Sequence, residues 1–214
     1  MDFSFLLDYG GFFVTGIKYT LILSVLSIVF GIIIGGVLAF MKISKSKILK
    51  TLATIYIEFI RGTPLLVQLY IIYLPFKFQS LTAGIMALSI NSAAYVAEII
   101  RSGIEGIDEG QMEASRSLGM SHWMSMRYIV IPQAFKNILP VLGNEFIAII
   151  KESSIISIIG VADLMRSADL VRATTYKQVE PLAVVAVLYF VITFTISKLM
   201  VRLERRLSIS DKSK

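Results

Sequence analysis

The sequence predicts an all-α, polytopic membrane protein with five transmembrane helices, folded as one domain over residues 1–214. Hydrophobic residues make up 56% of the chain and charged residues only 17%, and the mean hydropathy is +0.76. These values are typical of membrane proteins and argue against an ordinary soluble globule. The apolar residues also fall into long runs separated by polar segments, as successive membrane spans require.

Five apolar runs are long enough to cross a bilayer, which needs about 20 helical residues. We expect spans at residues 12–41, 52–76, 81–100, 132–150 and 181–201. The fourth run is the least clear because it contains Asn144 and Glu145. It would cover about 27 Å at helical rise, close to one hydrocarbon thickness, so we expect it to be shielded from lipid by other helices. Residues 155–161 are too few to cross, and we expect a re-entrant or peripheral segment there.

The distribution of basic residues predicts the orientation. Fourteen of the 21 Lys and Arg residues lie in the segments 42–50, 101–136 and 198–214, which five spans would place on one side of the membrane. Because basic loops stay in the cytoplasm, we expect the N-terminus outside and the C-terminus inside. The polar segment at about 102–132 then lies in the cytoplasm.

The tetrapeptide Arg61-Gly62-Thr63-Pro64 interrupts the second run and predicts a discontinuous helix. Thr63 suits a helix cap, Pro64 suits a first helical position, and Gly62 tolerates a break. A half-helix N-terminus beside Arg61 would favour a carboxylate ligand. The alternative is a plain kink, with Arg61 neutralised by Glu58 one turn earlier.

Two acidic residues, Glu145 and Glu152, are seven residues apart and so lie on roughly the same helical face. Such acids in a membrane pathway attract cations. We expect them to form a polar wall suited to a cationic side chain or an α-amino group, together with Asn91, Ser153, Ser154 and Asp163. The alternative is structural: Glu145 makes hydrogen bonds within the bundle, and Lys151 pairs with Glu152.

Glu98 and Arg101 are three residues apart, near the predicted cytoplasmic end of the third span. Residues at this spacing meet on one helical face. We therefore expect a structural ion pair and not a binding site.

Several function classes lack their usual residues. The chain has no cysteine and a single histidine, His122, so we expect no metal site. It has no phosphate-binding G-x-x-x-x-G-K-[ST] loop, and no nucleophile–base pair stands out, so we expect no enzyme activity. Its basic residues flank the spans and do not form one soluble face, which argues against a nucleic-acid partner.

The segment 113–132, EASRSLGMSHWMSMRYIVIP, is a polar island that predicts two short helices joined by a tight turn. Gly119 stands where a left-handed C-cap is needed, and Ser121 suits the N-cap of the second helix. Pro132 suits the first turn of the next helix because it lacks an N–H. From these residues alone, an ordinary cytoplasmic hairpin is the alternative to a docking element.

The spacing of this segment resembles the EAA loop of bacterial ABC importer permeases, Glu-Ala-Ala-x3-Gly-x9-Ile-x-Leu-Pro, from which Ser115 and Ile131 depart. Further segments resemble the polar amino-acid branch of that family: residues 61–68, 94–99 with Arg101, 110–114, 118–120, 132–134, Pro140 with Asn144, and 151–155. Where that branch commonly has Asp-Thr-Ser, this chain has Glu152-Ser153-Ser154.

The resemblance implies a type I ABC importer permease fold in the bacterial cytoplasmic (inner) membrane. It implies a second permease subunit, either another copy or a paralogue, and an extracellular substrate-binding protein. It also implies a separate ATPase that binds ATP and Mg, while this chain binds no cofactor itself. The residues expected to couple to the ATPase are Glu113, Ala114, Ser115, Leu118, Gly119 and Met120.

Together these features predict the membrane-spanning subunit of an ATP-driven amino-acid importer, with a preference for basic amino acids (Arg, Lys or His). The alternative is a secondary amino-acid transporter driven by an ion gradient, since carboxylates within the membrane also relay protons.

Overall fold

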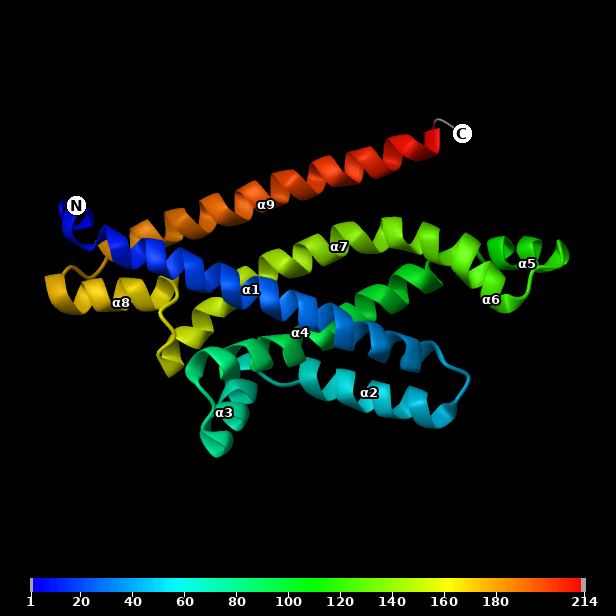
Figure 1. The fold of residues 1–214 in the computed structure, drawn as a ribbon, viewed down its shortest axis with the longest axis horizontal. Helices are drawn as coiled ribbons and strands as arrows, with labels where there is room; N and C mark the ends of the chain where they lie inside the picture. Colours follow the sequence, from blue (N-terminus) through cyan, green and yellow to red (C-terminus); the bar gives the residue numbers. More distant parts are fainter. Residues whose placement is uncertain (1, 213–214) are drawn as a thin grey trace.

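The structure, a computed structural model, describes residues 2–212 and the side chains of residues 2–205. Every regular element in the described chain is helical (Figure 1). In chain order the elements are α1 (Phe5–Ile43), α2 (Lys47–Arg61), α3 (Leu65–Phe76), α4 (Ser80–Glu105), α5 (Glu109–Ser117), α6 (His122–Ser125), the π-helix η1 (Met126–Val130), α7 (Ile131–Glu152), the 3₁₀-helix η2 (Ser153–Ile159), α8 (Leu164–Thr175) and α9 (Glu180–Lys212).

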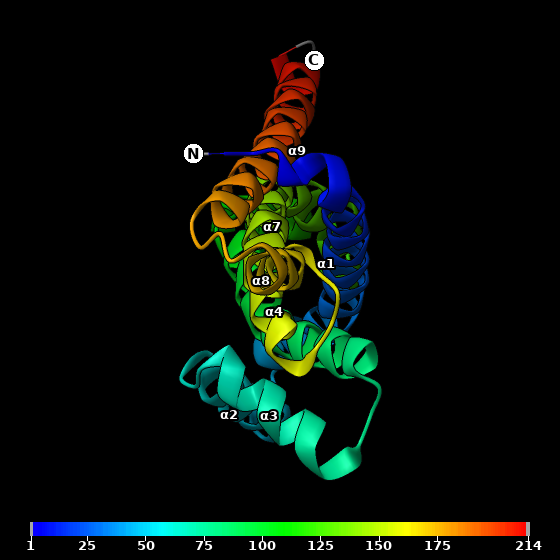
Figure 2. The ribbon, with the colours of Figure 1, turned by 90° about the vertical axis from the view of Figure 1, so that its left-hand side faces the viewer.

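The long helices α1, α4, α7 and α9 run lengthwise through an elongated bundle (Figure 1). The α5–α6 hairpin extends from one end of this bundle, where α9 also ends. Helix α8 and the start of α1 lie at the opposite end, while α2 and α3 lie on one side (Figure 2). The described chain therefore begins and ends at opposite ends of the bundle (Figure 1).

Three helices of the described chain are long and apolar enough to cross a membrane: Phe5–Ile43, Ser80–Glu105 and Glu180–Arg205. Helices α2 and α3 count as a fourth span only if the pair is taken together, and the pair is bent by 101°. Helix α7 has 22 residues but is more polar and does not meet the same criteria. Three or four spans are thus supported, and the predicted number of five stays a prediction.

The predicted break in the second run is confirmed, but its details differ. Thr63 does not cap the following helix; its hydroxyl donates back to the Phe59 carbonyl at 2.9 Å. Pro64 has an extended backbone (ψ 137°) and precedes α3, which begins at Leu65. The ring of Pro64 disfavours helical geometry in Thr63, the residue before it, so α2 does not continue into α3.

Helices α1 and α4 form the most extensive packing in the bundle. Two glycines, Gly31 and Gly35, permit it: a Cβ atom at Gly31 would lie 2.8 Å from the Ser92 hydroxyl oxygen, and one at Gly35 would lie 2.7 Å from the Ala93 carbonyl oxygen. Small residues at such positions let helix backbones approach closely inside a membrane.

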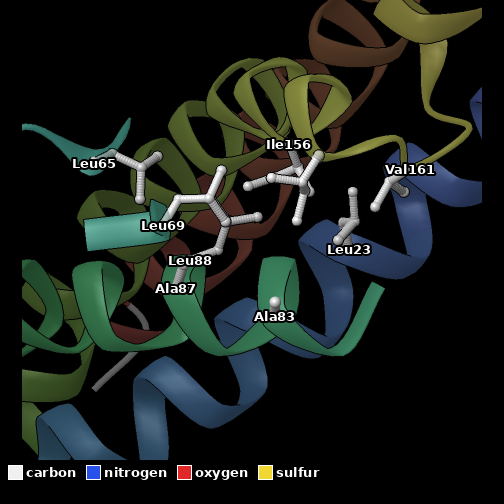
Figure 3. Packing of buried hydrophobic residues seen from close by; sticks show 9 residues of the cluster. Leu23, Leu65, Leu69, Ala83, Ala87, Leu88, Ile156 and Val161 are labelled. Carbon is white, nitrogen blue, oxygen red and sulfur yellow. The ribbon is translucent and has the colours of Figure 1, made fainter. Parts of the chain in front are cut away.

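The segment expected to be re-entrant or peripheral, residues 155–161, is part of the core. Its residues Ile156 and Val161 pack among Leu23 of α1, Leu69 of α3 and Leu88 of α4 (Figure 3). The segment is too short to cross the membrane, as expected, but its apolar side chains fill the space between three helices. It is therefore not peripheral.

Candidate functional site: coupling hairpin and membrane polar groups

Helix α5 begins and ends with well-formed caps. Asp108 accepts a hydrogen bond from the Gly110 amide at 2.9 Å, which caps the first turn. At the other end, the Gly119 amide donates to the Arg116 carbonyl at 3.0 Å and the Met120 amide donates to the Ser115 carbonyl at 3.2 Å. Gly119 has φ +86°. This pair of bonds around a left-handed glycine is a Schellman motif, so the predicted turn is confirmed.

The second helix of the hairpin also starts as predicted. Ser121 accepts a hydrogen bond from the Met124 amide at 3.2 Å and so caps α6. Only Met120 separates Gly119 from this cap, which makes the turn between α5 and α6 short. Both ends of the turn are held by hydrogen bonds, and the hairpin therefore has a defined shape.

The tip of the hairpin is apolar and exposed. Leu118 is 84% exposed and Trp123 is 68% exposed. Of the six residues expected to couple, Glu113, Ala114, Leu118 and Gly119 are exposed, Met120 is partly buried and Ser115 is buried. The Ser115 hydroxyl donates to the Met112 carbonyl at 2.9 Å, so this departure from the EAA pattern is satisfied within its own helix.

The predicted ion pair of Glu98 and Arg101 is confirmed. Both Nε and Nη2 of Arg101 donate to Oε2 of Glu98, at 3.0 and 2.8 Å. Lys42, at the end of α1, binds the other oxygen of Glu98, and Arg101 also binds Glu105. Lys42 was not expected because it lies 56 residues away in the sequence. This network joins α1 to α4 near the base of the hairpin.

Arg61 is exposed and lies at the end of α2. Its guanidinium carbon is 5.5 Å from the centre of the Tyr95 ring, a cation–π contact. The structure records no ion pair between Arg61 and Glu58 in the described chain, so the predicted alternative of mutual neutralisation is not observed. The Gly62 amide donates to the Glu58 carbonyl at 2.9 Å and closes α2.

Thr63 and Asn91 are brought together by a residue that was not predicted as part of the site, Gln68 of α3. Its Nε2 donates to the Ile60 carbonyl at 2.8 Å and to Thr63 Oγ1 at 2.9 Å, and its Oε1 accepts from Asn91 Nδ2 at 3.0 Å. Gln68 is buried. The signal in the sequence was a lone amide within the apolar segment 65–76.

Glu145 and Glu152 are both partly buried, and their carboxyl groups are close enough for their charges to interact. Glu145 also lies beside Ser92 of α4. The two neighbouring serines are occupied by the backbone: Ser153 donates to the Ile150 carbonyl at 2.8 Å and Ser154 to the Lys151 carbonyl at 2.7 Å. Of the predicted wall, the two glutamates interact through their charges, and Lys151 also interacts with Glu152.

Asp163 does not join the glutamates. Its side chain is fully buried and caps α8, with Oδ1 accepting from the Arg166 amide at 2.9 Å. Its other oxygen has no hydrogen-bond partner in the described structure, and Tyr189 of α9 lies nearby. Burial raises the pKa of Asp163 from 3.8 to about 7. The capping role explains its position better than a place on a wall does.

An all-helical bundle of spans with a capped hairpin at one end defines the class of protein. Residues 27–209 match the family described as binding-protein-dependent transport system inner membrane component, and the chain belongs to this family. It is thus a permease subunit of the ABC transporter class, and the resemblance noted in the sequence is confirmed.

Curated relatives cover almost the whole chain. The putative glutamine transport system permease of Rickettsia bellii is 42% identical over 93% of this chain and 94% of its own length. The arginine transport system permease of Bacillus subtilis is 41% identical over 99% of both chains. The glutamine transport system permease of Escherichia coli K12 is 40% identical over 92% of this chain and 93% of its own length.

Solved structures show the same fold. A chain in the crystal structure of an amino acid ABC transporter with histidines is 52% identical, with a TM-score of 0.93 over 96% of this chain and 99% of that chain. The inward-facing methionine ABC transporter MetNI is 21% identical, with a TM-score of 0.80 over 97% of this chain and 99% of its own. The second similarity concerns the fold alone.

Proposed function

We propose that this chain is the membrane subunit of an ATP-driven amino-acid importer. Two permease subunits, either two copies or this chain and a paralogue, enclose the translocation path. A separate ATPase that binds ATP and Mg docks on the hairpin through Glu113, Ala114, Leu118 and Gly119, with Ser115 and Met120 supporting the turn. The observation that carries this proposal is the hairpin: a hydrogen-bonded turn presents Leu118, 84% exposed, at one end of the bundle.

The orientation follows from the same assignment. The hairpin faces the cytoplasm, where the ATPase is, and the start of α1 faces outside, where a substrate-binding protein delivers the amino acid. The basic segments 42–50, 101–136 and 198–214 support this orientation, because positively charged loops favour the cytoplasm. The protein would lie in the bacterial cytoplasmic (inner) membrane.

We infer that the substrate is a basic amino acid. The relatives are named for glutamine and for arginine at almost equal identity, so their names do not decide the question. Glu145 and Glu152 support a cationic substrate because the two acidic groups interact with each other, and in the described structure the neighbouring Lys151 offsets only the charge of Glu152. Arg61, which has no acidic partner there, would receive the substrate carboxylate.

The test is reconstitution of the purified permease with its ATPase and binding protein in liposomes. We expect arginine, lysine or histidine to stimulate ATP hydrolysis and glutamine to stimulate it much less. Stimulation by glutamine alone would overturn the substrate assignment. Uptake that follows an imposed proton or sodium gradient without ATP would overturn the importer assignment and favour a secondary transporter.

A substitution tests whether Glu145 contributes to the preference for a basic amino acid. Glu145→Gln should raise the half-saturating arginine concentration about tenfold, the effect of losing roughly 1.4 kcal/mol of charge attraction. Glu204→Gln removes the same charge from an exposed residue near the end of α9 and serves as the matched control. Equal effects of the two substitutions would show that Glu145 acts only through net charge.

A further inference from the structure

Helix α5 of the hairpin is connected to α7 by a direct side-chain bridge as well as by the chain. The Nε2 of Gln133, in the first turn of α7, donates to the Oε1 of Gln111 in α5 at 3.2 Å. The same nitrogen donates to the Ile129 carbonyl at 3.0 Å. One amide group therefore joins the hairpin to the turn that precedes α7.

That turn is a π-helix, Met126–Val130, and not a continuation of the α-helix. The Ile131 amide donates to the Met126 carbonyl, five residues earlier. Pro132 follows and has no N–H to donate. Single π turns within α-helices are rare and are found frequently at functional sites. Gln133 donates to a carbonyl of this π turn.

Both sides of the π turn are anchored on α4. Val130 precedes the junction, Ala134 and Ile138 follow it, and all three pack with Ile104 in one buried cluster. Met112 of α5 packs against the same cluster, so a displacement of α5 also acts on the residues at the start of α7. The Gln111–Gln133 bridge spans that region.

We propose that Gln133 is a positioning residue for energy coupling: through Gln111 it transmits movements of α5 to the π turn and thereby to α7, which carries Glu145 and Glu152. The inference rests on the proposed function, since it requires an ATPase that moves the hairpin. It adds a specific contact to the docking surface, one that acts within the permease itself.

The test measures the ratio of amino-acid-stimulated to basal ATP hydrolysis in the reconstituted complex. Gln133→Leu and, separately, Gln111→Leu should lower this ratio about three- to tenfold, the effect of one lost hydrogen bond, while basal hydrolysis and ATPase co-purification stay unchanged. Asn137→Leu is the matched control, because Asn137 is exposed one turn further along α7 and the structure records no side-chain hydrogen bond for it. Its ratio should stay at the wild-type value.

A rescue separates positioning from a structural role. Gln133→Lys combined with Gln111→Glu keeps a donor at 133 and an acceptor at 111, and should restore the ratio. The link is overturned if the leucine variants couple normally, if they lose basal hydrolysis or assembly in proportion, or if the Lys/Glu pair does not restore coupling. Wild-type protein that shows no amino-acid stimulation would instead overturn the proposed function, so the two failures are distinguishable.

Discussion

Asn91 donates a hydrogen bond to Gln68 over 3.0 Å, and this contact attaches the middle of α4 to the first turn of α3. Gln68 in turn donates to the Ile60 carbonyl at 2.8 Å, near the end of α2, where this oxygen otherwise accepts longer bonds of 3.4 Å from Thr63. Both amides are buried. The bent α2–α3 pair is therefore held by a polar network, and its shape does not depend on proline alone.

Gln68→Leu should lower the free energy of unfolding by about 2 kcal/mol, because it leaves the Asn91 amide buried without its partner and removes the shortest hydrogen bond to the Ile60 carbonyl. The measurement is thermal unfolding of the detergent-solubilised protein. Val67→Ala, at a neighbouring residue that is 47% exposed, is the control and should change stability far less. Equal stability of Gln68→Leu and wild type would show that water replaces the network.

Glu98→Ala should lower the free energy of unfolding by about 2 kcal/mol, because it removes the acid that Lys42 and Arg101 share. Solvent screening limits the loss, because these side chains remain 14–29% exposed. Glu105→Ala, whose side chain is 52% exposed, should cost less than about 1 kcal/mol. The same unfolding assay compares the two variants. A larger loss of stability for Glu105→Ala than for Glu98→Ala would contradict the role of Glu98 as the shared partner of Lys42 and Arg101.

Leu118→Asp should abolish co-purification of the ATPase while the permease itself stays as stable as wild type. The side chain is 84% exposed, so the substitution removes no internal packing. Pull-down of the ATPase and thermal unfolding of the isolated permease are measured on the same preparation. Normal ATPase binding would place the docking contact elsewhere on the hairpin.

Asp163 should make stability depend on pH. Its pKa is raised by burial from 3.8 to about 7 in the folded protein, and the nearby Asp169 also disfavours its charge. Since the folded state binds the proton more tightly, stability is greatest below pH 4, falls as the pH rises toward 7, and is level above that. Asp163→Asn preserves the cap and should flatten this part of the profile. An unchanged profile would assign the dependence to other groups.

Local features were predictable wherever neighbouring residues determine the geometry. The Schellman turn at Gly119, the Ser121 cap, the break after Arg61 and the Glu98–Arg101 pair each depend on residues within a few positions of one another. Backbone preferences and i,i+3 contacts act over this range, so these features can be predicted from the sequence alone.

Long-range partners were not predictable. Gln68 lies 23 residues from Asn91, and Lys42 lies 56 residues from Glu98. Asp163 was expected on the wall with the glutamates, but it caps α8 in a fully buried position. Its acidic side chain suggested a ligand site. Aspartate is also a common helix N-cap, and the sequence alone does not distinguish these two roles.

By itself the sequence determined the helical class, the apolar runs and the turn chemistry of the hairpin, because composition and local backbone preference are properties of the chain. Only the tertiary structure decided which polar groups meet: that Gln111 reaches Gln133, that Gln68 joins α3 to α4, and that residues 155–161 fill the core. The physical reason is that a buried polar group must find a partner wherever helix packing places one, and packing is settled by the shapes of all the helices together.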